Sequence, residues 1–140
     1  MQTTTTTQGN SIINDLMKAI NGEYNAICMY EHLAKLAPNQ EVCERILEIR
    51  QDEIRHYLSF SQLFTCLTGQ TPTPQLSEEV PENFVDGIYS AFFDEQQSTE
   101  FYHEIARNSY IPMVSQTFLT NAADEQTHAV WFLFYINQYS

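Results

Sequence analysis

Basic side chains are scarce in this sequence: six Lys and Arg stand against 18 Asp and Glu, which gives a formal net charge of −12. Nucleic-acid-binding proteins use basic surfaces to neutralise phosphates, so the composition argues against this class. The same charge argues against binding to an anionic membrane surface. Charged residues make up only 17% of the chain, below the roughly 25% of an ordinary domain. The acidity therefore reflects a shortage of bases.

Long apolar runs are also missing, because the longest one, residues 130–136, is far shorter than the ~20 residues of a membrane-spanning helix. The first residues carry neither the basic nor the apolar region of a secretory signal, and we expect a cytoplasmic protein. The three cysteines, Cys28, Cys43 and Cys66, form no Cys-x-x-Cys pair. This argues against a disulfide framework and a thiolate metal site, and we expect buried, reduced thiols.

Five prolines, at positions 38, 72, 74, 81 and 112, divide the chain into four long segments. Each segment carries apolar residues at helical spacing, and none shows the alternation of a strand. After a disordered polar tail at residues 1–10, the first predicted helix has Ser11 as its N-cap and runs to about residue 36. The second follows residues 38–39 and ends near residue 68, with Gly69 as its stop. The third runs from about residue 81 to 108, and the fourth from about residue 112 almost to the C-terminus. Short connections predict two antiparallel hairpins, and connection 69–80 is long enough to run the length of a bundle. The alternative for this connection is a loose hairpin loop. The sequence thus predicts an all-α fold in which residues 11–140 form one four-helix bundle with a long crossover.

The second half of the sequence repeats residues of the first half at a fixed offset. Glu23 aligns with Glu95, and Tyr30 aligns with Tyr102. The Glu-x-x-His motif at positions 53 and 56 aligns with the same motif at positions 125 and 128. In each copy, the midpoint between the two glutamates falls in a predicted turn. Antiparallel folding of each hairpin therefore brings its two glutamates level with each other.

Helical periodicity places this polar set on the apolar stripes that face the predicted core. The set is Glu23, Glu53, His56, Glu95, Glu125 and His128. Buried carboxylates without a counter-charge are very costly, and no Lys or Arg occupies the stripes at this level. Two divalent cations would cancel the four negative charges, and Glu and His at i, i+3 can bind one ion. We therefore predict a site for two metal ions; the alternative is a set of hydrogen-bonded core pairs.

These residues resemble the rubrerythrin branch of the ferritin-like di-iron family over about residues 10–138. The resemblance implies a ferritin-like bundle whose six polar core residues bind two iron ions, or manganese in their place. It also implies that Tyr30 and Tyr102 hydrogen-bond the ligand carboxylates. The sequence differs from the peroxidase type of rubrerythrin at Ser98, where that type has a further carboxylate. It also contains no paired Cys-x-x-Cys motifs of a rubredoxin-like domain.

The implied function is that of a di-iron oxidoreductase, of ferroxidase or peroxidase type, that oxidises Fe(II) with O₂ or H₂O₂. An external electron donor is a further expected partner. The alternatives are an iron-binding or storage protein without turnover, a dimanganese catalase-like protein, and a bundle that metals only stabilise. Val130, Trp131 and Phe134 are expected to point away from the site, and this apolar patch predicts a homodimer. We expect His32 and His103 to face solvent.

Overall fold

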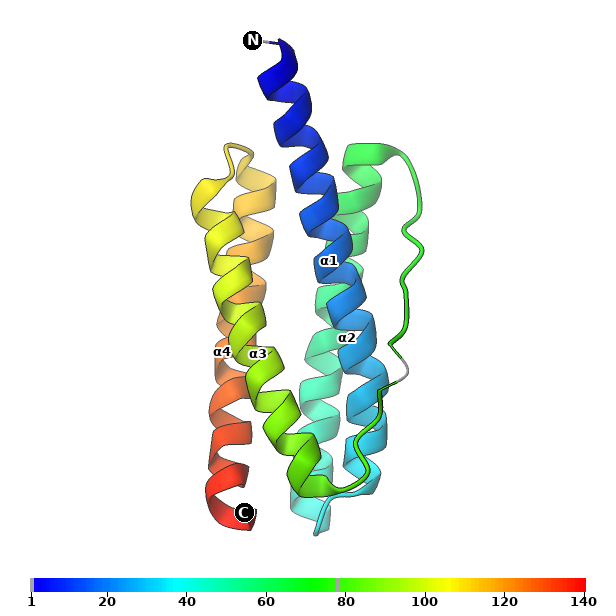
Figure 1. The fold of residues 1–140 in the computed structure, drawn as a ribbon, viewed down its shortest axis with the longest axis vertical. Helices are drawn as coiled ribbons and strands as arrows, with labels where there is room; N and C mark the ends of the chain where they lie inside the picture. Colours follow the sequence, from blue (N-terminus) through cyan, green and yellow to red (C-terminus); the bar gives the residue numbers. More distant parts are fainter. Residues whose placement is uncertain (1, 78) are drawn as a thin grey trace.

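The computed structural model describes residues 2–77 and 79–140, with side chains described from Ser11 onward. The helices are α1 (Gln2–Lys35), α2 (Gln40–Thr68), α3 (Phe84–Asn108) and α4 (Pro112–Tyr139). They lie along one long axis as a bundle (Figure 1). No strand occurs among the residues described, which confirms the predicted all-α fold. Within the same residues, no helix combines the length and the apolar character needed to cross a membrane.

Local side-chain and backbone features explain where three of the helices begin and where α2 ends. The side chains of Asn39 and Asn83 accept hydrogen bonds from backbone N–H groups in the first turns of α2 and α3. Pro112 begins α4, where its missing N–H leaves no helical hydrogen bond unmade. Gly69 ends α2 with a φ of 71°, a left-handed conformation that favours glycine. Because Asn83 is the N-cap, α3 begins at Phe84, three residues later than predicted.

The first helix begins earlier than the sequence predicts. We expected Ser11 as its N-cap and a disordered tail at residues 1–10, whereas α1 is helical from Gln2. Each residue added to an existing helix gains a hydrogen bond without a new nucleation cost, so a polar segment can extend it. The N-terminal end of α1 projects beyond the other helices (Figure 1). Met1 lies outside the described residues.

The helices pair as predicted, α1 mainly with α2 and α3 mainly with α4, and each pair forms an antiparallel hairpin (Figure 1). Contacts between α1 and α3, and between α2 and α4, are sparser. Buried apolar side chains form two clusters along the axis. Phe60 and Phe118 belong to one cluster, with ring centroids 4.7 Å apart. Tyr30 and Phe132 belong to the other, with centroids 5.4 Å apart.

The connection between α2 and α3 runs along the outside of the bundle beside α1 (Figure 1). The backbone N–H of Gln75 donates to the side chain of Asn21, 2.9 Å away, and the side-chain amide of Asn25 donates to the carbonyl of Gln75, 3.0 Å away. Nε2 of His32 donates to the carbonyl of Pro81 over 3.0 Å. The prediction that His32 faces solvent is therefore wrong, because this half-buried ring fastens the connection to α1.

The three cysteines are free, as expected, but they are not all buried. Cys28 and Cys43 are half-buried, whereas Cys66 is exposed. The expectation of a buried thiol is wrong for Cys66 because Leu63 and Phe64 occupy the inward positions of that part of α2. His103, also expected to face solvent, is half-buried.

Candidate metal centre

The six polar residues predicted as metal ligands meet at the middle of the bundle, between the two apolar clusters. Each is at most 2% exposed. One glutamate comes from α1 and one from α3, and a Glu-x-x-His pair comes from each of α2 and α4. We call them the Glu–His layer: Glu23, Glu53, His56, Glu95, Glu125 and His128. The fold therefore brings together every residue of the predicted ligand set.

The layer contains two overlapping groups of four ligand atoms, and within each group these atoms lie within 4.8 Å of one another. The first group is Glu23, Glu53, His56 and Glu125, and the second is Glu53, Glu95, Glu125 and His128. Glu53 and Glu125 belong to both groups, so these two carboxylates can serve two ions. Each remaining glutamate and each histidine belongs to one group, so the layer offers each of two ions two ligands of its own and two shared ones.

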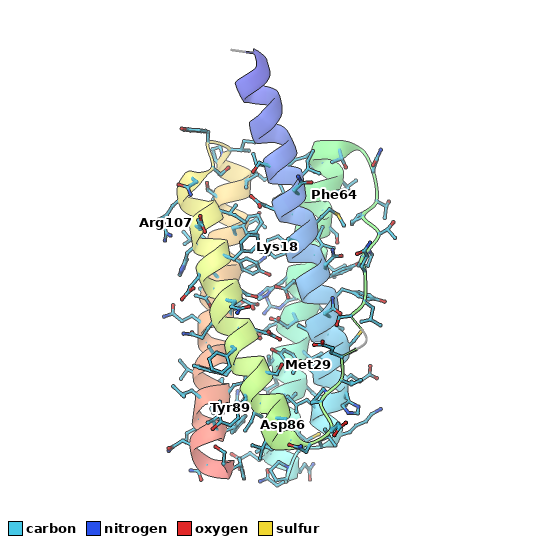
Figure 2. The ribbon with its side chains drawn as sticks, in the orientation of Figure 1. Lys18, Met29, Phe64, Asp86, Tyr89 and Arg107 are labelled. Atoms are coloured by element: carbon cyan, nitrogen blue, oxygen red, sulfur yellow. The ribbon has the colours of Figure 1, made fainter. Side chains whose placement is uncertain are left out.

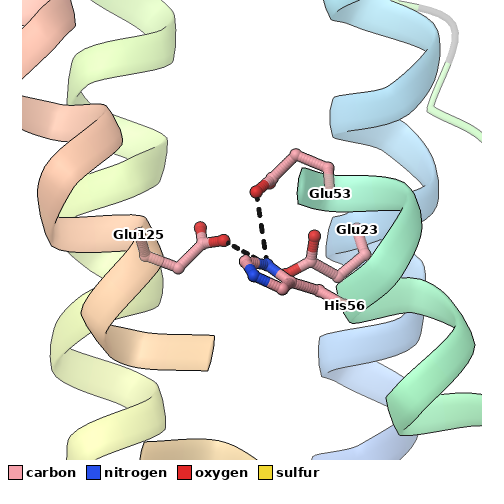
Figure 3. A group of neighbouring side chains, drawn as sticks. All are labelled: Glu23, Glu53, His56 and Glu125. Carbon is pink, nitrogen blue, oxygen red and sulfur yellow. Dashed lines mark hydrogen bonds and ion pairs between the residues drawn. The ribbon is translucent and has the colours of Figure 1, made fainter. Parts of the chain in front are cut away.

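Distances within the two groups are short and similar. Nδ1 of His56 lies 2.9 Å from Oε1 of Glu125 and 3.3 Å from Oε1 of Glu53. Figure 3 shows this group, in which carboxylates from three helices converge on the His56 ring. Nδ1 of His128 lies 3.2 Å from Oε1 of Glu53 and 3.4 Å from Oε2 of Glu95. In both groups, Nδ1 of the imidazole faces the carboxylates.

Two buried tyrosines hold the unshared glutamates across the bundle. The hydroxyl of Tyr30 on α1 donates to Oε1 of Glu95 on α3, and the hydroxyl of Tyr102 on α3 donates to Oε1 of Glu23 on α1, each over 2.6 Å. The structure thus contains the two hydrogen bonds that the family resemblance implies. Burial raises the pKa of both phenols well above the usual value, and the neighbouring carboxylates add to this shift. Both hydroxyls therefore stay protonated donors.

Two aspartates outside the layer orient its histidines, and the sequence analysis did not assign them a role. Nε2 of His56 lies 2.8 Å from Oδ2 of Asp124, and Nε2 of His128 lies 2.8 Å from Oδ2 of Asp52. A carboxylate that accepts from Nε2–H turns Nδ1 inward, as second partners of metal-binding histidines do. The signal was present in the repeat, because Asp precedes Glu at both 52–53 and 124–125.

Comparisons with known proteins place the chain in a family. No family model matches it. The uncharacterized protein YhjR of Bacillus subtilis (strain 168) is 46% identical over 125 residues, which cover 89% of this chain and 86% of YhjR. The chain belongs to the YhjR family. Because the matched residues cover 89% of this chain, the similarity to YhjR includes residues of all four helices.

Solved structures with low sequence identity share the YhjR-family fold. A hypothetical protein from Pyrococcus furiosus superposes with a TM-score of 0.77 at 18% identity, covering 90% of this chain and 88% of that one. The conserved hypothetical protein rv2844 from Mycobacterium tuberculosis gives 0.78 at 13%, covering 94% and 95%. CopM in a silver-bound form gives 0.78 at 13%, covering 92% and 98%. At such identities these likenesses establish the fold alone.

Protons take the place of cations in the metal-free Glu–His layer of this YhjR-family chain. Burial raises the pKa of Glu53 and Glu125 well above the usual value, and repulsion from Glu23 raises it further. Burial opposes the charging of His56, but hydrogen bonds with Glu125 and Glu23 outweigh it and raise the pKa of His56 to about 10. Metal ions would have to displace these protons in order to bind.

The residues of the layer fit a pair of divalent cations. Four of its buried atoms have no hydrogen-bond partner: Oε2 of Glu23, Oε1 of Glu53, Oε2 of Glu95 and Nδ1 of His128. A buried polar atom without a partner costs about 1–3 kcal/mol, so several at one point favour a missing ligand. Carboxylate oxygens and imidazole nitrogens are donors that suit iron and manganese.

A cavity of about 680 Å³ lies between α1 and α3 and reaches the layer. Its lining includes four glutamates of the layer, both buried tyrosines, and residues 77 and 79–82 of the connection. Ser98 also lines it. Asp94 lies in the same lining, and burial raises its pKa, with the charges of Glu95 and Glu79 adding to the effect. The layer is thus reached from one side of the bundle.

Proposed function

We propose that this YhjR-family chain is a ferritin-like, rubrerythrin-type protein that binds two iron ions and oxidises Fe(II) with O₂ or H₂O₂. The observation that carries the proposal is the pair of four-ligand groups that share Glu53 and Glu125. The path of the connection supports the ferritin-like assignment, because it lets α2 and α3 run in the same direction (Figure 1). A single long crossover of this kind is a feature of ferritin-like bundles.

Each part of the layer has a role in such a site. Glu53 and Glu125 belong to both groups and would contribute to holding both ions, and the oxygen and nitrogen donors of the layer suit iron. Tyr30 and Tyr102 fix the unshared glutamates, and the apolar clusters on both sides keep bulk water out. When bound, two iron ions would each supply one electron for the reduction of O₂ or H₂O₂.

The test is to load metal-free protein with Fe(II) without oxygen, count the bound iron, and then mix it with O₂ or H₂O₂. We expect two iron atoms per chain and rapid oxidation, followed by the absorbance of the Fe(III) product. Glu53→Ala removes a carboxylate from both groups and should abolish the protein-dependent oxidation. Glu100→Gln, on the exposed face of α3, is the control. An oxidation rate in Glu53→Ala equal to that of the wild type would refute the proposal.

Iron counts and two further measurements separate the alternatives. An iron-storage protein would take up many more than two irons per chain. A dimanganese catalase-like protein would release O₂ from H₂O₂ after manganese loading, without net oxidation of the metal. A bundle that metals only stabilise would show a higher melting temperature with metal and no redox reaction. The cytoplasmic location and the external electron donor stay predictions.

The homodimer is also part of the proposal. Val130 and Phe134 on α4 are 62% and 49% exposed. Trp131 contributes less than expected, because it is half-buried and the Arg45 guanidinium lies 4.0 Å from its ring centroid. Covering such an apolar patch with a second copy would remove it from water. Light scattering at micromolar concentration should report twice the chain mass, and a monomer would contradict this part.

A further inference from the structure

The cavity between α1 and α3 ends on carboxylate oxygens that lack a partner. Glu23 and Glu95 line it, each is 1% exposed, and Oε2 of each accepts no hydrogen bond. Tyr102 and Tyr30 occupy the other oxygen of each carboxylate. The free oxygens belong to the two helices that form the cavity walls. Its inner end therefore presents two buried carboxylate oxygens that a cation in the cavity or the layer could bind.

The outer part of the cavity is acidic as well. Its described lining contains four exposed acids, Glu79, Glu82, Asp86 and Asp94, and one basic residue, Lys18. The Lys18 ammonium lies over a phenylalanine ring, 4.2 Å from its centroid. Figure 2 shows Lys18 in the upper half of α1, far along the bundle from Asp86 at the start of α3. A cleft lined by one sign of charge concentrates ions of the opposite sign, here cations.

Small side chains keep the route open. Gly22, Ala26 and Ser98 line it. A Cβ atom added at Gly22 would meet no atom within 4 Å, so there is free space beside α1 at the level of Glu23. The walls thus leave room between the acidic mouth and the unpartnered oxygens.

On the opposite side of the bundle, the described side chains next to the layer are engaged in charged contacts. There, Asp52 and Asp124 are bonded to the Nε2 atoms of the two histidines. The guanidinium of Arg55 pairs with Asp52 and lies 3.7 Å from Oδ2 of Asp124. A cation arriving from this side would meet a positive charge and would have to break the bonds that orient the histidines.

We propose that divalent cations reach the Glu–His layer through the cavity between α1 and α3, and that Asp94 captures them at its mouth. The inference rests on the proposed function, since it requires a metal centre at the inner end. Among the four acids of the mouth, Asp94 is the one adjacent in sequence to a residue of the layer, Glu95. Asp86 lies more than two helical turns away on α3. A cation held by Asp94 is therefore already level with its final ligands.

The experiment measures how fast Co(II), whose visible absorption changes on binding, loads the metal-free protein in a stopped-flow instrument. Asp94→Asn removes the charge at the mouth, and Asp94→Lys reverses it. Glu100→Gln is the matched control, because it removes an exposed acid of the same helix that does not line the cavity. Circular dichroism and the final count of Co(II) per chain show that each variant folds and keeps its ligands.

We expect Asp94→Asn to slow loading about threefold and Asp94→Lys about tenfold at low ionic strength. Both differences should shrink as salt is added, because salt screens an exposed charge. The final amount of bound Co(II) should not change, since neither substitution removes a residue of the layer. Ser98→Phe should slow loading at every salt concentration, because it fills the cavity.

Four outcomes would count against the route, and they separate it from the proposed function. Wild-type loading rates in Asp94→Lys, or equal slowing in Glu100→Gln, would overturn the route while the metal centre stands. A lower final Co(II) content in Asp94→Asn would make Asp94 a ligand and would overturn its capture role. A wild-type protein that binds no Co(II) would refute the proposed function, and the route with it.

Discussion

The two sides of the Glu–His layer are built differently, although each consists of helices that correspond in the repeat. The repeat relates α1 to α3 and α2 to α4, so each side contains one kind of helix twice. On the α2–α4 side, Asp52, Asp124 and Arg55 close the layer with charged hydrogen bonds. On the α1–α3 side, small and acidic residues leave a cavity. A duplicated hairpin can thus produce one side that orients ligands and another that admits them.

The largest expected difference between the sides concerns the glutamates themselves. Glu53 on α2 belongs to both four-ligand groups, whereas Glu23 on α1 belongs to one. We expect Glu53→Gln to lose both metal ions and Glu23→Gln to keep one. Elemental analysis after dialysis against Mn(II) or Fe(II) measures this. Equal metal content in the two variants would show that the shared and unshared positions are equivalent.

The metal-free protein should lose stability as the pH rises. The pKa of His56 is about 10 in the folded protein against the usual 6.5, so its contribution is complete below pH 6.5 and is lost as the pH approaches 10. The raised pKa values of Glu53 and Glu125 also make stability fall as the pH rises, and this fall begins at a lower pH than that of His56. Scanning calorimetry of the metal-free protein should show a falling melting temperature across this range.

Added metal should oppose the fall in melting temperature with rising pH. Metal ions displace the protons of the layer, so their binding strengthens as the pH rises, and the stabilisation by Mn(II) should grow. The outer carboxylate Asp52 differs, because hydrogen bonds with His128 and Arg55 outweigh its burial and lower its pKa. Its contribution to the stability of the fold is present at neutral pH and is lost only in acid. A melting temperature of the metal-free protein that rises toward pH 10 would contradict the assignment of protons to the layer.

A smaller effect is expected when the orienting residues are changed. Asp52→Asn and Asp124→Asn keep the shape but weaken the acceptor at Nε2 of each histidine. Such partners typically contribute 10–100-fold to metal affinity, so we expect a loss of about tenfold or more in the double variant. Isothermal titration with Mn(II) measures it. The double variant Tyr30→Phe, Tyr102→Phe makes the matched change on the α1–α3 side, and an equal loss there would remove the distinction between the two sides.

The smallest effect compares two glycines inside helices. Gly22→Ala adds a methyl group beside the open cavity, where nothing lies within 4 Å, and should stabilise α1 by about 0.5–1 kcal/mol. Gly87→Ala places a Cβ 2.4 Å from Cδ1 of Leu33 and 3.2 Å from Cβ of Pro81. It should destabilise the bundle by about 1–3 kcal/mol. Urea unfolding of the metal-free variants measures both, and the same sign for both would contradict the described packing.

The helices and ligands were predictable because their signals are local or periodic. Proline positions, the stop at Gly69 and apolar periodicity predicted the four helices, and the repeat identified the six residues of the layer. The predictions for His32 and for the start of the first helix were wrong because contacts and hydrogen bonds with neighbouring parts of the chain changed the local structure. The connection between α2 and α3 covers His32, and helical hydrogen bonding continues past Ser11 toward Gln2.

The cross-bundle contacts could not be predicted from one segment at a time. Tyr30 bonds Glu95 rather than the glutamate of its own helix, and His128 bonds Asp52 rather than Asp124. Both pairings depend on which helices are diagonal or adjacent in the bundle. Sequence spacing shows on which face of its own helix a residue lies. It does not show which residue of another helix that face will meet.

The sequence by itself determined the helices, the pairing into hairpins and the ligand types of the layer, because these follow from periodicity within a segment and from repetition between segments. Only the tertiary structure decided that Glu53 and Glu125 are shared and that the layer opens between α1 and α3. Both depend on the distances between separate helices. Those distances are determined by side-chain packing over the whole bundle, which no single segment encodes.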